Sequence, residues 1–274
     1  MVFEQLFQPT WIEKKIHAFS LAFVYTLIGI LSAKLIFPSN VGLMSIAFTS
    51  ILLIPSLAVL LRIEENEETL AAGKFSIRRL FSDHTDIVKV YLLMFLGIFT
   101  AYSLTSLVLP EMTISNLFTT QLKTAGIHGF AMSNSLFWNM ILNNMLVFVV
   151  CFVLSLIYGA GAVLFLTWNA SVWGVVFAYY AKQAAGSADG LFREFTCLMS
   201  GVLPHMTTEA LAYIFAAFVG GIVSKAVLRE KLFSPQFYHI VTDAMILLVI
   251  GLILVFIAGI IEMNAPFNLF AFCS

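Results

Sequence analysis

His205 and Glu209 lie four residues apart inside a long apolar stretch, MSGVLPHMTTEALAYIFAAFVGGIVS (199–224). A spacing of four places both side chains on one face of a helix. An ionisable group within a bilayer costs roughly 2.5–3.5 kcal/mol on insertion scales, so it usually faces the protein interior. An imidazole and a carboxylate one turn apart can exchange a proton, join two helices, or supply part of a metal site. Two ligands do not complete a metal site, so the sequence predicts no cofactor, with His205 and Glu209 the only candidate metal ligands.

Three asparagines occupy the two apolar stretches that precede this pair. Asn143 and Asn144 lie in one stretch and Asn169 in the next. An amide buried away from water must find a hydrogen-bonding partner. We therefore predict an intramembrane polar cluster in which His205 and Glu209 face these amides. A structural bridge between helices is the favoured interpretation of these residues, because such bridges are common in membrane bundles.

Small residues follow the polar pair at every fourth position of the same stretch. Ala212, Ala216 and Gly220 continue the face that begins with His205. Small side chains at this spacing let two helices approach closely in lipid. Three further glycines are predicted to serve tight packing or a tight turn: Gly159, Gly161 and Gly174.

The composition identifies the solvent of this fold as lipid. The chain has 274 residues, of which 61% are hydrophobic and 11% charged, whereas a soluble domain carries about 25% charged residues. Its formal net charge is −1, so no basic field favours a nucleic-acid partner. The full sequence also lacks a phosphate-binding glycine loop with its lysine, a Gly-x-Ser-x-Gly motif and a His-Glu-x-x-His motif.

The apolar stretches predict an all-α polytopic transmembrane bundle of about seven spans, because each is long enough to cross as a helix. We expect one integral membrane domain over residues 1–274. The predicted spans are 16–37, 42–61, 88–109, 137–158, 160–181, 203–224 and 240–262. Residues 62–87 are predicted to form a cytoplasmic polar loop or a surface helix, and 110–136 a re-entrant or interfacial helix. Asp243 and Glu262 lie at the two ends of the last span, where we expect interface residues.

The distribution of lysine and arginine predicts the orientation of the chain. These residues are more numerous in the segments that share a side with the N-terminus. Basic segments stay on the cytoplasmic side of a membrane. We therefore predict a multi-pass protein of the cell membrane with a cytoplasmic N-terminus and a C-terminus outside.

Residues 137–179 and 203–224 together resemble the stage II sporulation protein M family of prokaryotic membrane proteins. The family's pattern is an Asn-Asn-like helix start, a tight glycine turn, an Asn before a Gly, and a Pro-His segment with a Glu that opens a small-residue helix. The matching positions are Asn143, Asn144, Gly159, Gly161, Asn169, Gly174, Pro204, His205, Glu209 and Gly220. Two positions depart from the pattern: Met206 follows the histidine and Ala170 follows the asparagine, where the family carries glycine. The first 110 residues carry no such resemblance.

The resemblance implies a membrane scaffold or partner subunit. The founding member of the family is a multi-span protein that works with a peptidoglycan hydrolase and another membrane protein during engulfment in sporulating bacteria. Relatives also occur in organisms that do not sporulate, archaea included. We therefore expect a non-enzymatic component of a cell-envelope complex, whose partners are the bilayer and a membrane protein or a second copy.

Two other functions remain open from the residues. A transporter or channel would use the polar cluster as a binding site near broken helices, as many transporters do. An intramembrane metal-dependent hydrolase would need a metal held at His205 and Glu209.

Overall fold

The computed structural model describes residues 15–70, 77–127, 134–185, 188–232 and 234–264. All regular elements in these ranges are α-helices. They are α3 (Lys15–Ile36), α4 (Val41–Leu70), α5 (Ile77–Val108), α6 (Glu111–Leu117), α7 (Thr119–Ile127), α8 (Asn134–Tyr158), α9 (Val163–Ala184), α10 (Ala188–Arg229) and α11 (Pro235–Asn264).

The helices are long and apolar enough to form a membrane bundle, which confirms the predicted fold class. Within the described ranges, six helices qualify as candidate spans, and Val41–Leu57 of α4 forms a shorter apolar helix. Together they agree with the prediction of about seven spans. The mean hydropathy of the whole chain, +0.98, fits this arrangement.

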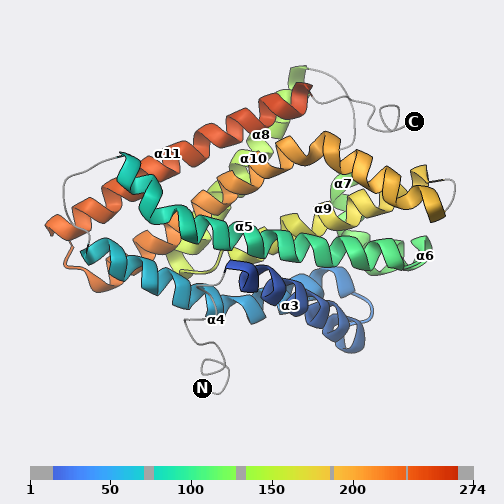
Figure 1. The fold of residues 1–274 in the computed structure, drawn as a ribbon, viewed down its shortest axis with the longest axis horizontal. Coiled ribbons are helices and arrows are strands. Elements are labelled where there is room, and N and C mark those ends of the chain that lie inside the picture. Colours follow the sequence, from blue (N-terminus) through green and yellow to red (C-terminus); the bar gives the residue numbers. More distant parts are fainter. Residues whose placement is uncertain (1–14, 71–76, 128–133, 186–187, 233, 265–274) are drawn as a thin grey trace.

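Helix α10 is the central element of the bundle (Figure 1). It packs most extensively on α11 and α8 and also contacts α9, α4 and α5. Helices α3, α4 and α5 form the other side of the molecule, and α5 joins the two sides by packing along α9. At 42 residues, α10 is about 63 Å long, which exceeds the roughly 30 Å of hydrocarbon in a bilayer.

Close contacts at two glycines and one lysine show how three of the helices are arranged. Gly97 of α5 meets the backbone of Phe19 in α3, and Gly174 of α9 meets the backbone of Phe99 in α5. Further along α5 and α9, Lys182 donates to the carbonyl oxygen of Leu109 at 2.6 Å. Both partners therefore advance together along α5 and α9, so these two helices run parallel. Figure 1 shows α3 running in the same direction as α5. Since α3 and α5 run the same way, α4 must return between them.

The polar segment at 62–87 was predicted to be a loop or a surface helix, and its described part is helical. Helix α4 continues to Leu70 and α5 begins at Ile77, so helix covers most of this segment. Residues 71–76 lie outside the described residues. The run of glutamates at 64–68 is compatible with helix because glutamate has a high helix propensity.

The start of α10 also differs from the prediction. The predicted span begins at 203, whereas the helix begins at Ala188 and contains both Gly190 and Gly201. A glycine inside a helix costs about 1 kcal/mol relative to alanine. Leu198 is buried, and Phe195 and Met199 pack against the core. This packing offsets the cost, so these glycines do not end the helix.

The region 110–136 contains two short helices, α6 and α7, where one short helix was predicted. Gln121 of α7 is fully buried and donates to the carbonyl oxygen of Gly42 at 3.0 Å. Ser45 donates to the same carbonyl and accepts from the hydroxyl of Tyr102, at 2.9 and 2.8 Å. This network anchors α7 to α4 and α5. Residues 128–133 lie outside the described residues.

Candidate functional site

His205 joins the middle of α10 to the last two turns of α11. Its Nδ1 lies 3.1 Å from the carbonyl oxygen of Ala258. Its Nε2 lies 2.8 Å from Oε2 of Glu209 on the same helix and 3.5 Å from Oε2 of Glu262 on α11. The side chains of His205 and Glu209 are 16% and 7% exposed, whereas that of Glu262 is 38% exposed.

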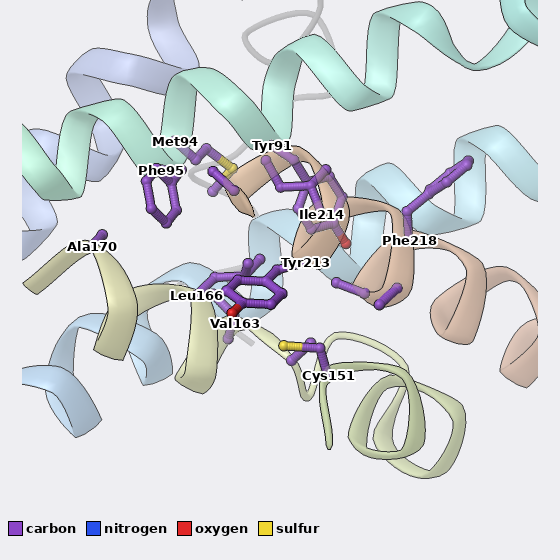
Figure 2. Packing of buried hydrophobic residues seen from close by; sticks show 14 of the residues in the cluster. Tyr91, Met94, Phe95, Cys151, Val163, Leu166, Ala170, Tyr213, Ile214 and Phe218 are labelled. Carbon is purple, nitrogen blue, oxygen red and sulfur yellow. The ribbon is translucent and has the colours of Figure 1, made fainter. Parts of the chain in front are cut away.

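Glu209 makes a second hydrogen bond deeper in the bundle. Its Oε1 accepts from the hydroxyl of Tyr213 at 2.5 Å, one turn further along α10. The two oxygens of this carboxylate are therefore shared between an imidazole and a phenol. Figure 2 shows Tyr213 in the packed core with Val163 and Leu166 of α9 and Cys151 of α8. Apolar packing closes the site on this side.

The hydrogen-bond partners of the imidazole indicate which of its ring nitrogens carries a proton. The carbonyl oxygen of Ala258 can only accept, so Nδ1 must carry a proton. One further proton is then shared between Nε2 and the carboxylates that face it. With that proton on Nε2, an imidazolium faces two carboxylates, and the three side chains carry a net charge of −1. This arrangement can bridge two helices or hold and release a proton.

Pro204 precedes this histidine inside α10. Proline lacks a backbone N–H, so the helical ladder loses one hydrogen bond here. The hydroxyls of Thr207 and Thr208 donate to the carbonyl oxygen of Pro204 at 3.1 and 2.8 Å. The contact between His205 and α11 therefore lies next to a position where the backbone of α10 lacks one helical hydrogen bond.

The predicted asparagines make hydrogen bonds of their own. Asn143 donates to the side-chain oxygen of Asn144 at 3.5 Å, and Asn169 donates to the carbonyl oxygen of Phe165 at 2.8 Å. The polar partners that the structure gives to His205 and Glu209 are Tyr213, Glu262 and the Ala258 carbonyl instead of these amides. The cluster thus differs in membership from the prediction.

Asn144 nevertheless lies at the level of Glu209. A Cβ atom added to Gly220 would come within 2.8 Å of the Cβ of Ser155, and one added to Gly251 would meet both Phe148 and Phe215. Gly220 of α10 thus lies against residues 152–156 of α8, 64–68 positions earlier, and Gly251 of α11 meets Phe148 of α8 and Phe215 of α10, which are 67 positions apart. Helices α8 and α10 therefore run parallel. The same offset aligns Asn144, which is buried, with Glu209.

The stripe of small residues is buried, and its last member, Gly220, lies at the contact between α10 and α8. Ala212 and Ala216 are fully buried, and Gly220 lies directly against the backbone of Phe152. The remaining predicted glycines also occupy tight places. Gly159 has a φ of 67° in the turn before α9, a Cβ on Gly161 would lie 2.6 Å from the Leu154 carbonyl oxygen, and Gly174 packs on α5.

Two members of the site were missed from the sequence. Tyr213 continues the four-residue spacing of His205 and Glu209, so extending that spacing by one more turn would have found it. Glu262 was predicted to be an interface residue. No sequence signal sets the register of α11 against α10, so its approach to His205 could not be foreseen.

Among the residues that the structure describes, no group of three or more His, Cys, Asp or Glu side chains could hold a metal ion. A second histidine–carboxylate pair, His239 and Asp243, lies near the other end of α11, with 3.2 Å between Nδ1 and Oδ2. Its half-exposed imidazole distinguishes it from the buried joint at His205.

Comparison with models of protein families matches residues 84–264 to the family described as Stage II sporulation protein M. No curated protein and no solved structure matches this chain. The match begins four residues before the third predicted span and includes α8 to α11, which carry every residue of the site. Because it covers more than half of the chain, the protein belongs to the Stage II sporulation protein M family.

Proposed function

We propose that this chain is a non-enzymatic scaffold subunit of the cell membrane, which holds a membrane-protein partner or a second copy of itself in a cell-envelope complex. The observation that carries the proposal is the use of the central polar side chains. Both ring nitrogens of His205 and both oxygens of Glu209 bond within the chain. These groups stiffen the bundle and are not left free for a reactant.

The packing of the bundle is consistent with this role. The glycine contacts at Gly97, Gly174 and Gly220 bring backbones together across three helix pairs, and close packing is the main source of helix association in lipid. A rigid bundle of this kind can present fixed lipid-facing surfaces to a partner. In this proposal the N-terminus is cytoplasmic and the C-terminus lies outside, as the basic residues predict.

Crosslinking in native membranes, followed by native gel electrophoresis, tests the scaffold role. We expect the wild-type chain to migrate in an assembly larger than its monomer. Glu209→Leu should reduce the folded yield and the assembly to the same extent, because the carboxylate acts through the fold. A chain that migrates as a monomer from native membranes would contradict the proposal. A Glu209→Leu variant that folds fully but loses the assembly would contradict it as well.

A transporter or channel is the second candidate, and one observation favours it. Glu262 adds a second carboxylate, partly exposed, within 3.5 Å of a buried imidazole. Ionisable groups in membrane segments often mark ion or proton pathways. Ion or proton flux in proteoliposomes that disappears with Glu209→Gln would favour this candidate. Flux equal to that of empty liposomes under every imposed gradient would favour the scaffold.

A further inference from the structure

We infer that the His205 site binds one exchangeable proton, and that this proton holds the last turn of α11 against the middle of α10. The inference concerns the isolated chain and stands whether or not the scaffold proposal is correct. Its basis is the geometry of three side chains: one imidazole nitrogen, Nε2, faces two carboxylate oxygens at 2.8 and 3.5 Å.

The two carboxylates approach the same nitrogen from different environments. Glu209 is buried on α10, whereas Glu262 is partly exposed near the end of α11. A proton can therefore pass between water and Nε2 by way of the Glu262 carboxylate. It enters by protonating Oε2 of Glu262, which then donates it to Nε2, and it leaves by the reverse steps. Neither direction needs another reactant.

The deeper side of the site has no continuing proton path among the described residues. Beyond Tyr213, the face of α10 continues with Ala216, Ala217 and Gly220, all buried. The titratable groups of the neighbouring helices there are Cys151 of α8 and Tyr91 of α5, both buried members of the apolar core. The geometry thus favours a site that stores a proton over one that conducts it across the bundle.

Loss of the proton removes the attraction between the two helices. The imidazole then keeps only its Nδ1–H, which donates to the Ala258 carbonyl oxygen. The lone pair of Nε2 now faces the oxygens of Glu209 and Glu262, and two carboxylates repel each other without an intervening cation. Pro204 gives α10 a weakened backbone at the same level. We therefore expect the last turn of α11 to move away from α10 as pH rises.

Distance measurements between spin labels test this inference in lipid nanodiscs. Labels carried by a non-natural amino acid at Leu203 of α10 and Met263 of α11 occupy exposed positions on both sides of the joint. We expect a short, narrow distance distribution at about pH 5 that lengthens by several ångströms and broadens towards about pH 9, a range that includes imidazole titration. A control pair on the same helices, at Leu228 and Met245, should not change.

Two variants make the outcome decisive. His205→Asn removes the titrating ring but keeps an amide donor, so its distance distribution should be the same at every pH. Glu262→Gln leaves one uncompensated carboxylate, so it should reduce the lengthening at high pH. The inference fails if the wild-type distances do not change with pH, or if His205→Asn shows the wild-type change. If His205→Asn does not fold, a Glu262→Gln variant with the full wild-type change also overturns it.

Discussion

At the scale of single residues, the site depends on a few buried polar atoms that all have hydrogen-bond partners. The carboxylate of Glu209 accepts from two different groups, and its partner imidazole reaches a backbone carbonyl on another helix. A buried polar group that loses its partner costs more than the hydrogen bond contributed. Removal of one partner should therefore lower the free energy of unfolding by more than the loss of one hydrogen bond would.

Tyr213→Phe tests this statement with the smallest possible change. The variant removes one hydroxyl and leaves Oε1 of Glu209 without its donor in an apolar environment. We expect a loss of about 1–3 kcal/mol in the free energy of unfolding, measured by denaturant titration in detergent micelles. Tyr91→Phe is the matched control, because Tyr91 is also a buried core tyrosine but does not contact Glu209. Equal losses in the two variants would contradict a special role for Tyr213.

The two carboxylates should differ in their effect on stability. Loss of a buried charged partner typically costs about 3–5 kcal/mol, whereas an exposed ion pair contributes about 0–1 kcal/mol. Glu209→Leu should therefore lower the melting temperature far more than Glu262→Leu, as measured by thermal unfolding in detergent. Similar melting temperatures for the two variants would contradict the larger stabilising contribution expected from the buried hydrogen bonds of Glu209.

At the scale of helices, close backbone contact is the recurring feature. A Cβ on Gly220 would meet the Phe152 carbonyl oxygen and the Cβ of Ser155, and neither of these can move independently of α8. We expect Gly220→Ala to destabilise the bundle by about 1–3 kcal/mol through overpacking. In contrast, Gly201→Ala on the same helix, at a half-buried position, should be neutral or stabilising by up to about 1 kcal/mol. Denaturant unfolding of both variants checks the contrast, and a harmless Gly220→Ala would contradict the contact.

Lys182 is expected to stabilise the end of α5 from a distance in sequence. Its ammonium donates to the carbonyl oxygen of Leu109, next to the last residue of α5, where carbonyls lack helical partners. Lys182→Met should speed amide hydrogen exchange in the last turn of α5, because that turn loses its tether to α9. Lys123→Met, at an exposed position, is the control. Unchanged amide hydrogen exchange in the last turn of α5 would contradict a stabilising role of Lys182 there.

At the scale of the whole molecule, much of the fold could be predicted and the register of the site could not. Apolar length identifies the spans because every backbone group in lipid must bond within a helix. The small residues after His205 marked a packing face for a different reason, because small side chains let two helices approach closely in lipid. The start of α10 was missed because Gly190 and Gly201 look like helix breakers, although tertiary packing overrides their low propensity. The approach of Glu262 depends on how α11 lies against α10, which no local pattern encodes.

The parallel course of α3 and α5 requires α4 to cross the membrane, and with the proposed cytoplasmic N-terminus it predicts the sides on which two loops lie. A cysteine introduced at Ser39, between α3 and α4, should react with an impermeant reagent from outside the cell. A cysteine at Leu232, between α10 and α11, should react only from the cytoplasmic side. The parent chain without either substitution supplies the background labelling. Reaction of both cysteines from the same side would contradict the topology, and reversed sides would contradict only the predicted orientation.

The central claim is that the imidazole and the carboxylate of α10 stabilise the bundle as a pair. A double-mutant cycle of His205→Leu and Glu209→Leu, followed by denaturant unfolding, tests it most directly. We predict that the double variant loses at least about 1 kcal/mol less stability than the sum of the two single losses, because each single change strands the other group. Losses that add within about 0.5 kcal/mol would contradict the claim.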